Sequence, residues 1–339
     1  MTAEKPGATA DRGPRSTVSA QRIADSDAGQ RIDNFLLRHF KSVPRSRVYR
    51  LLRKGEVRVN GKRIDADYRL AAGDTVRLPP VRIEPDAAGP GRPSASLQAL
   101  IERAVIHEDR HLLVIDKPSG VAVHGGSGMS FGVIETLRAA RPGEPLELVH
   151  RLDRDTSGCL LVARDRPTLV ALHALIRDGG LHKTYLALLA GSWQLGKKRI
   201  DAPLATDARE RGERHVHVAT TGKASVSVFQ PVQFFGPLAT LMEVEIPTGR
   251  THQIRVHARH AGHPVLGDDK YGDRERNAAM REYGLHRIFL HAHSVAFDWP
   301  GSGMPFHASA PLPPDLAAVI DRLPRARGKR RGARAQGKG

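Results

Sequence analysis

Acidic and basic side chains alternate within one short segment near the middle of the chain. Residues 150–158 have the sequence HRLDRDTSG, and the charged members are Arg151, Asp153, Arg154 and Asp155. Apolar runs stand on both sides and Asp-Thr-Ser-Gly is typical of a turn, so we expect a loop at a strand end. A carboxylate beside a guanidinium keeps its charge and orientation, as a nucleophile or base requires. The same four residues can equally form a salt-bridge cluster without chemistry.

Two more polar side chains lie where the local pattern predicts rigid support. Tyr185 belongs to an apparent strand at 183–188. Arg250 follows an alternating strand at 242–246 and a Pro-Thr-Gly turn, and a helix is expected over 251–261. A tyrosine in a strand is more often a core residue, and an arginine in a turn often pairs with a surface acid or a phosphate. The pattern alone leaves both roles open.

Histidine and glycine clusters raise other possibilities. Four histidines lie close together: His252, His257, His260 and His263. They lack a metalloprotease spacing and cysteine partners, and His-rich basic segments often bind RNA, so we expect no metal site there. The glycine loop at 124–128 lacks the lysine and hydroxyl of a nucleotide triphosphate loop. The single cysteine, Cys159, lies in an apolar run and is expected in the core.

The chain is strongly basic. Its 339 residues carry 53 Lys and Arg against 36 Asp and Glu, a net charge of +17. Such an excess favours polyanions, and nucleic acid is the first candidate ahead of a membrane surface. No apolar stretch matches a membrane span or a signal peptide, so we expect no membrane partner and a cytoplasmic location.

A compact basic block is expected over residues 20–81. One apolar helix face repeats over 30–40, and a second helix begins at Pro44. Asn60-Gly61 predicts a hairpin turn whose second strand is 62–64. The second helix carries basic side chains on one face: Arg47, Arg50 and Lys54. This face suits an RNA backbone, and a solvated surface of a structural domain is the alternative.

The remaining segments complete the division of the chain. A Pro- and Gly-rich stretch predicts a linker at 82–96. From 97 to 323, apolar strands alternate with helical stretches, which predicts a mixed α+β domain. Residues 1–19 and 324–339 lack periodicity, so we expect disordered ends, the second of them a basic arm.

Four stretches resemble, in order along the chain, the motifs of the RluA family of pseudouridine synthases. They are KPSGVAVHGG (117–126), HRLDRDTSG (150–158), HKTYLALLAG (182–191) and TGRTHQIRVH (248–257). The resemblance places the family's catalytic aspartate at Asp153, its active-site tyrosine at Tyr185, its arginine at Arg250 and an apolar contact at Ile254.

The basic block resembles the S4 domain, an RNA-binding module, through RIDNFLLRHF, SRVYRLLRKGEVRVNGKRI and AGDTVRLP. GQRIDNFL, LRKGEVRVN, HGGSGMSFGVIETLRA and YGDRE are most similar to the RluC subfamily, which acts on uridines of large-subunit (23S) ribosomal RNA. The resemblance implies an α+β catalytic domain with a mixed, largely antiparallel sheet, preceded by a small S4 domain. It also implies a monomer.

The implied reaction converts uridine to pseudouridine: the bond from C1′ to N1 breaks, the base turns, and C1′ joins C5. Nothing is oxidised and no group enters, so we expect no cofactor. Asp153 would act as a nucleophile or would take the C2′ proton, and the sequence is compatible with both. Arg250 would pair with Asp153, and Tyr185 would stack on the extruded uracil. Arg151 and His124 are further candidates for RNA contact.

Two other functions fit parts of this pattern. A non-catalytic S4-type RNA-binding or ribosome-assembly factor would use the basic block and the tails, but it would not need Asp153, Tyr185 and Arg250 together. An RNA methyltransferase would need a glycine-rich cofactor loop after a strand, and the sequence lacks one.

Overall fold

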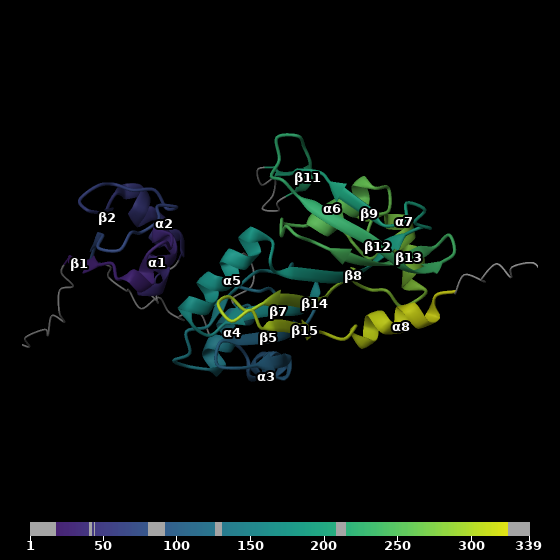
Figure 1. Ribbon diagram of the computed structural model, residues 1–339, viewed down its shortest axis with the longest axis horizontal. Helices are drawn as coiled ribbons and strands as arrows, with labels where there is room; N and C mark the ends of the chain where they lie inside the picture. Colours follow the sequence, from purple (N-terminus) through teal and green to yellow (C-terminus); the bar gives the residue numbers. More distant parts are fainter. Residues whose placement is uncertain are drawn as a thin grey trace, which may run out of the picture. The chain divides into compact units, whose positions relative to one another are not determined.

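The computed structural model describes residues 18–40, 43, 45–80, 92–125, 131–207 and 215–324. The chain forms two compact units that divide between Gly91 and Arg92 (Figure 1). The predicted disordered ends lie outside the described residues, apart from residues 18, 19 and 324, and so does the predicted linker up to residue 91.

The N-terminal unit packs two helices against a small sheet. Its elements are β1 (Ser19–Arg22), the 3-10 helix η1 (Asp25–Asp27), α1 (Ile32–His39), α2 (Arg45–Lys54), β2 (Arg58–Val59) and β3 (Thr75–Leu78). The antiparallel strands have the order β1-β3-β2. Phe35 and Leu36 of α1 and Val48 and Leu52 of α2 share one core, as their helical spacing predicted.

The predicted turn at Asn60-Gly61 forms, but the predicted strand at 62–64 does not. Lys62 makes only an isolated bridge, and β2 pairs with β3 instead. Asn60 accounts for the difference. Its Oδ1 accepts a hydrogen bond from Thr75 N (2.9 Å), and its Nδ2 donates to Asp74 Oδ1 (2.8 Å). These bonds hold β3 beside the turn, where the predicted strand would have paired.

The larger unit is built on a ten-stranded sheet of order β4-β5-β7-β14-β8-β13-β12-β9, with β6 also beside β7 and β15 also beside β14. The strands are β4 (Val105–Glu108), β5 (Leu112–Lys117), β6 (Glu147–Leu148), β7 (Ser157–Ala163), β8 (His182–Ala190), β9 (Lys198–Asp201), β12 (Val226–Phe235), β13 (Ala239–Glu245), β14 (Leu290–Asp298) and β15 (Pro305–Ser309). Neighbouring strands run antiparallel except β7 and β14. A separate two-stranded sheet joins β10 (Leu204–Thr206) to β11 (Val216–Val218). The predicted fold class is confirmed.

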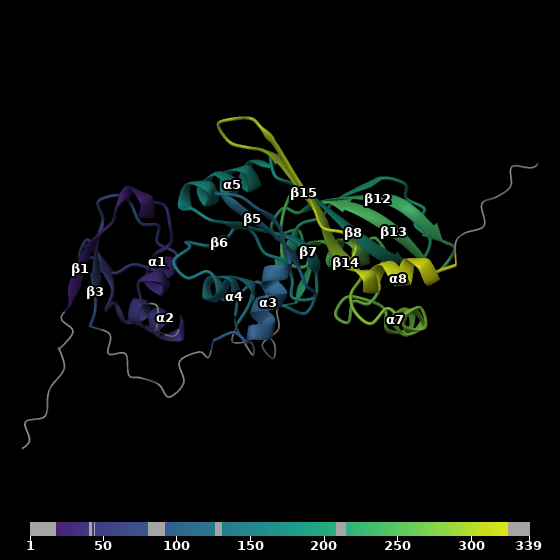
Figure 2. The same cartoon turned by 90° about the horizontal axis from the view of Figure 1, so that it is seen from below.

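Helices cover both faces of the ten-stranded sheet. They are α3 (Ala95–Arg103), α4 (Val133–Ala140), α5 (Arg166–Asp178), α6 (Gln253–His260), α7 (Arg274–Arg281) and α8 (Pro314–Arg322). Figure 2 shows α5 on one side of β5 and β7, and α3 and α4 on the other. Leu113 and Ile115 of β5 pack in the core with α3 and α4, while Leu112 and Val114 pack in the core with α5. Burial on both faces explains why β5 is continuously apolar.

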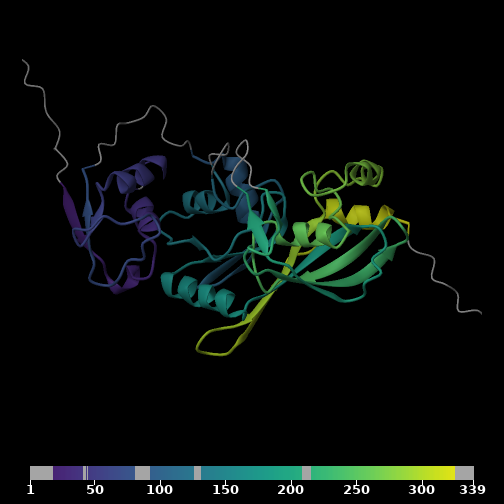
Figure 3. The same ribbon diagram turned by 90° about the horizontal axis from the view of Figure 1, so that it is seen from above.

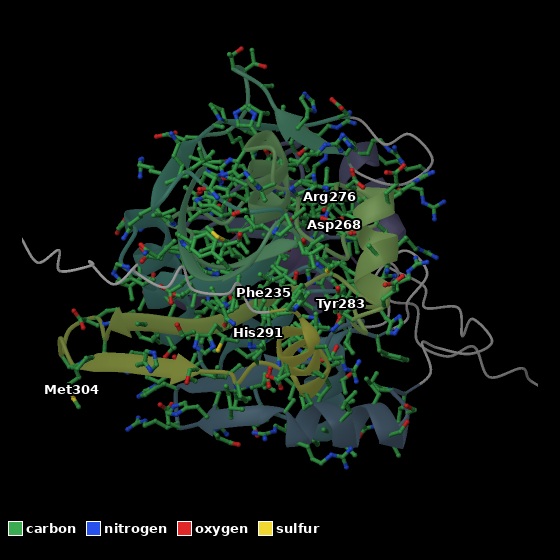
Figure 4. The ribbon with its side chains drawn as sticks, turned by 90° about the vertical axis from the view of Figure 1, so that its right-hand side faces the viewer. Phe235, Asp268, Arg276, Tyr283, His291 and Met304 are labelled. Carbon is green, nitrogen blue, oxygen red and sulfur yellow. The ribbon has the colours of Figure 1, made fainter. Side chains whose placement is uncertain are left out.

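Exposure differs sharply between the hairpin tip and the sheet interior of this unit, as one methionine and the single cysteine show. The hairpin of β14 and β15, drawn in yellow, projects from the sheet (Figure 3). Met304 lies at its tip and is 65% exposed (Figure 4), whereas Cys159 on β7 is fully buried, as predicted. None of the helices within the described ranges is long and apolar enough to cross a membrane.

Candidate active site

The Asp153 loop, residues 149–156, joins β6 to β7 and is fastened by Lys117. The Lys117 side chain is fully buried, and its Nζ donates hydrogen bonds of 2.8 Å to the carbonyls of Pro118, Val121 and Arg154. Burial lowers the pKa of Lys117 to about 7, while three carbonyl acceptors match the three N–H donors of its charged form. These bonds fix the Asp153 loop to the segment that follows β5.

Gly158 brings the Asp153 loop against β14. Its backbone has a φ of +107°, and a Cβ at this position would lie 2.2 Å from the carbonyl oxygen of Ala292. Gly158 and Ala292 are paired residues of the parallel strands β7 and β14. Only glycine permits this approach. The last residue of the HRLDRDTSG segment is therefore required by packing as well as by the turn.

An ion-pair chain reaches Asp153 from helix α6. Arg255 Nη1 lies 3.4 Å from Asp153 Oδ2, and Arg255 Nε and Nη2 donate 2.7 Å hydrogen bonds to the two oxygens of Asp268. Asp268, labelled in Figure 4, is 1% exposed and also accepts from the backbone N–H groups of Lys270 and Tyr271. Burial alone raises the pKa of Asp268, but hydrogen bonds and charge from Arg255 lower it overall. Asp268 thus fixes the guanidinium that faces Asp153.

The sequence pointed to Arg250 for the pairing with Asp153, and the structure places Arg255 there instead. Arg250 is exposed in the turn before α6. Its backbone N–H donates to Gln253 Oε1 (3.0 Å), and its Nε donates to Ala224 O (3.2 Å). Arg255 lies within the helix, on the side that faces Asp153. Arg250 still lines the same cavity as Asp153, so its contact with substrate stays a prediction.

His252 is the second α6 residue beside Asp153. It caps the N-terminus of the helix with a left-handed backbone, at a φ of +54°. This conformation is uncommon outside glycine and occurs often at functional sites. His252 Nε2 lies 3.8 Å from Asp153 Oδ2. Burial lowers the pKa of His252, which favours its neutral form.

Tyr271 supports both α6 side chains. Its hydroxyl accepts a hydrogen bond from Val216 N (3.0 Å) and lies 2.8 Å from His252 Nδ1. Its ring lies 5.0 Å from the guanidinium carbon of Arg255. When the Tyr271 hydroxyl donates to Nδ1, the proton of neutral His252 is on Nε2, facing Asp153. The ring also shields one face of the guanidinium from water.

Asp153 lines a narrow cavity of about 60 Å³. Part of its wall is apolar and aromatic, because the buried residues Tyr185, Ile254 and Leu290 line it beside polar ones. Burial raises the pKa of Tyr185, and the negative charge of Asp153 raises it further. A carboxylate at an apolar and aromatic wall is suited to a flat, uncharged ring with a sugar attached.

A wider hollow of about 900 Å³ shares Asp153 and Arg255 with the narrow cavity. Charged side chains of both signs line it: the basic residues are Arg151, Arg154, Arg255, Lys270 and Arg287, and the acidic ones are Asp153, Asp155, Asp268 and Asp269. His124 and His286 line it too. The guanidinium and ammonium groups among them can contact the phosphate groups of a nucleic acid.

The structure brings six of the predicted site residues to this region. Asp153, Tyr185, Arg250, Arg151 and Ile254 line the narrow cavity, and His124 lines the wider hollow. The other three belong to α2 in the N-terminal unit, where Arg47 is half-buried and Arg50 and Lys54 are exposed.

Five residues of the site were assigned no role in the active site from the sequence: Lys117, His252, Arg255, Asp268 and Tyr271. Four of them lie in the motif stretches, and Asp268 comes shortly before YGDRE. The separation of three residues between His252 and Arg255 was the available signal, because it puts both on one helix face.

Two further histidines of the 252–263 cluster make hydrogen-bond contacts within the fold. His257 is buried, with its ring nitrogens 2.9 Å from Ser227 Oγ and from Ala202 O. His263 Nδ1 lies 2.8 Å from Ala190 O. The glycine loop at 124–128 lies outside the described residues beyond Gly125.

Comparison with known families identifies both units. Residues 111–260 match the RNA pseudouridylate synthase family, and residues 30–76 match the S4 domain. The chain is 49% identical over 314 residues to ribosomal large subunit pseudouridine synthase C of Escherichia coli (strain K12), which covers 92% of this chain and 98% of that relative. It is 49% identical over 307 residues to the relative of the same name from Pasteurella multocida, with 90% and 94% covered.

Solved structures agree with the fold. The human RNA pseudouridylate synthase domain containing 1 is 26% identical with a TM-score of 0.52, covering 64% of this chain and 86% of that chain. The human RNA pseudouridylate synthase domain containing 4 has a TM-score of 0.56 at 24% identity, covering 67% and 95%, and shows the same fold. From the near-complete alignments at 49% identity, this chain belongs to the RNA pseudouridylate synthase family.

Proposed function

We propose that this protein converts uridine to pseudouridine in large-subunit ribosomal RNA, with Asp153 at the reacting sugar carbon. One observation carries the proposal: the Asp153 carboxylate faces Arg255 and lines a cavity walled by Tyr185 and Ile254. The names of the relatives at 49% identity refer to the large ribosomal subunit, which supports this RNA over others.

The reaction moves one bond and one proton. The C1′–N1 bond breaks, the freed base turns, the C1′–C5 bond forms, and the proton leaves C5 while N1 gains one. Asp153 attacks the sugar or the base as a nucleophile, or it takes the C2′ proton, and the cavity suits each route. Substrate and product are isomers, so we propose that no cofactor takes part.

The residues around Asp153 orient its carboxylate and hold the target nucleotide. Arg255 orients the carboxylate and balances its charge. Tyr185 stacks on the extruded uracil, and its hydroxyl relays the C5 proton. Ile254 packs against the base. Arg250, at the exposed edge of the cavity, contacts the ribose or its phosphate.

RNA outside the target nucleotide is held by charge. Arg151 and His124 in the wider hollow contact phosphates beside the extruded nucleotide. The basic face of α2, with Arg47, Arg50 and Lys54, binds RNA backbone through the S4 domain. We propose that the protein acts as a monomer, as the family resemblance implies. A ribosomal RNA substrate supports the proposal that the protein acts in the cytoplasm.

The test compares wild type with Asp153→Asn on unmodified large-subunit ribosomal RNA, without added cofactor. Pseudouridine is mapped at nucleotide resolution. Asn keeps the size of Asp and removes the charge, so it tests the carboxylate rather than the fold. Asp178→Asn is the matched control, because Asp178 is exposed at the end of α5. Wild type and control should form pseudouridine at the same sites, and Asp153→Asn should form none.

Pseudouridine in the Asp153→Asn reaction would contradict the role of Asp153. RNA binding by all three proteins, with pseudouridine in none of the reactions, would favour a non-catalytic assembly factor or a different RNA.

A further inference from the structure

The small sheet of β10 and β11 presents two unlike faces. Leu204 and Val216 are buried on one face, in a cluster with Val256 and Tyr271. Side chains alternate along a strand, so His217, which pairs with Ala205, belongs to the opposite face. Asp207 and His215 extend the same pairing, since Asp207 N donates to His215 O (3.0 Å).

Three side chains that can bind a metal lie close together at the end of this sheet where β10 and β11 pair through Asp207 and His215. One ligand atom from each of Asp207, His215 and His217 lies within 4.8 Å of the other two. Asp207 Oδ2 and His217 Nδ1 are 3.2 Å apart, and these side chains are 60% and 41% exposed. The connection 208–214 lies outside the described residues, so these three residues alone define the cluster.

We propose that Asp207, His215 and His217 form a binding site for one Zn²⁺ ion per chain. Donors on a tetrahedral Zn²⁺, at about 2.1 Å from the metal, lie roughly 3.4 Å from one another. The contact of 3.2 Å between Asp207 and His217 already matches this separation. The ligand atom of His215 already lies within 4.8 Å of the other two. A rotation of its exposed side chain would bring it to the shorter separation that the metal requires.

The ligand set points to zinc rather than to magnesium or calcium. Two imidazoles and one carboxylate are typical of zinc and similar transition metals, whereas Mg²⁺ and Ca²⁺ take oxygen ligands. A surface ion pair would need only one histidine beside Asp207. The second imidazole at the same point distinguishes the cluster from such a pair. These histidines differ from the four clustered at 252–263, where the sequence predicted no metal site.

The bound ion would join β10 to β11 at the end of the hairpin. His215 and His217 flank Val216, whose N–H donates to the Tyr271 hydroxyl in the active site (3.0 Å). The His215 ring itself lies 5.3 Å from the Tyr271 ring. The site is thus outside the catalytic cavity but next to one of its supports. The inference does not rest on the proposed RNA substrate.

The experiment measures Zn²⁺ bound to the full-length chain without an affinity tag, by equilibrium dialysis against micromolar Zn²⁺. Asp207→Asn, His215→Ala and His217→Ala remove one ligand each. His307→Ala is the matched control, because His307 is exposed and lies on β15 of the ten-stranded sheet, not in the sheet that carries the cluster. Wild type and His307→Ala should bind one Zn²⁺ per chain. Each ligand variant should bind at least about tenfold more weakly.

Cobalt and magnesium supply a second readout. Co²⁺ in place of Zn²⁺ should give an intense visible spectrum typical of tetrahedral coordination, lost in His217→Ala, and millimolar Mg²⁺ should not displace it. Circular dichroism confirms that each variant folds. Binding that the three ligand substitutions leave unchanged would overturn the proposal, as would one ion shared between two chains or no binding at micromolar Zn²⁺.

Discussion

The active-site cavity and the basic face of α2 both use positively charged side chains, but they hold them in opposite ways. Arg255 has a side chain only 13% exposed and donates two 2.7 Å hydrogen bonds to the buried Asp268. Arg50 and Lys54 on α2 are exposed. A buried, doubly bonded charge has a fixed position, whereas exposed charges attract RNA at long range and are screened by salt. Substitutions around Arg255 should therefore change the rate of the chemical step, whereas substitutions on α2 should change the affinity for RNA.

Among these substitutions, removing the carboxylate that holds Arg255 should lower kcat the most. Asp268→Asn keeps the shape of the side chain but loses the charge that holds the guanidinium in place. Because a displacement of about 1 Å in an active site can cost about 100-fold in rate, we expect kcat for pseudouridine formation to fall about 100-fold. KM should change little, since Asp268 is a positioning residue whose side chain is buried and bonded to Arg255. Single-turnover and steady-state kinetics measure both values.

The control for Asp268→Asn is an exposed ion pair in the same unit. Asp201 pairs with Arg199 at 3.0 Å, and both side chains are 58% exposed. Asp201→Asn should leave kcat within about twofold of wild type, because exposed pairs contribute little. An equal loss of kcat in the two variants would show that Asp268 acts through the net charge of the protein rather than through its bond to Arg255.

The buried Asp268–Arg255 pair should also make the stability of the protein depend on pH. The pKa of Asp268 is lowered from its ordinary value of 3.8, so the unfolded chain binds more protons below that value. Asp268 therefore contributes stability that is present above pH 3.8 and is lost as the pH falls through its lowered pKa. Urea unfolding from pH 6 to pH 2 should show a shallower loss of unfolding free energy in Asp268→Asn than in wild type. If the unfolding free energies of the two proteins fell in parallel with pH, Asp268 would not be the source of this pH dependence.

The α2 face should give the smallest effect on the chemical step. Arg50→Ala combined with Lys54→Ala should weaken RNA binding and leave kcat unchanged. If both side chains contact phosphates, the slope of log affinity against log salt should fall by about 1.5 to 2. Lys197→Ala combined with Lys198→Ala removes the same charge from an exposed part of the other unit. Equal changes of slope in both double variants would argue against a specific role for α2.

Local patterns predicted much of the fold and the main parts of the site. The apolar spacing of α1, the alternation in β13 and the turn sequence after Asp153 are short-range signals, and each element formed near its predicted place. Tyr185 and Ile254 line the cavity with Asp153 because β8, α6 and the Asp153 loop are rigid pieces that the motifs already marked.

Long-range contacts explain what the sequence did not predict. Arg250 and Arg255 stand in one motif, and only the position of Asp268, thirteen residues beyond Arg255, decides which guanidinium faces Asp153. The strand expected at 62–64 was displaced because Asn60 bonds to Thr75. Neither partner can be identified from the residues next to it.

The position of β14 determines when this protein can complete its fold during synthesis. β14 pairs with β7 on one side and with β8 on the other, yet β8 ends at Ala190 and β14 begins at Leu290. Until β14 leaves the ribosome, the strand beside the Asp153 loop and the strand with Tyr185 are not joined, and their edges stay open. We therefore expect a growing chain to be inactive until β14 has emerged, and its open strand edges to favour aggregation until then.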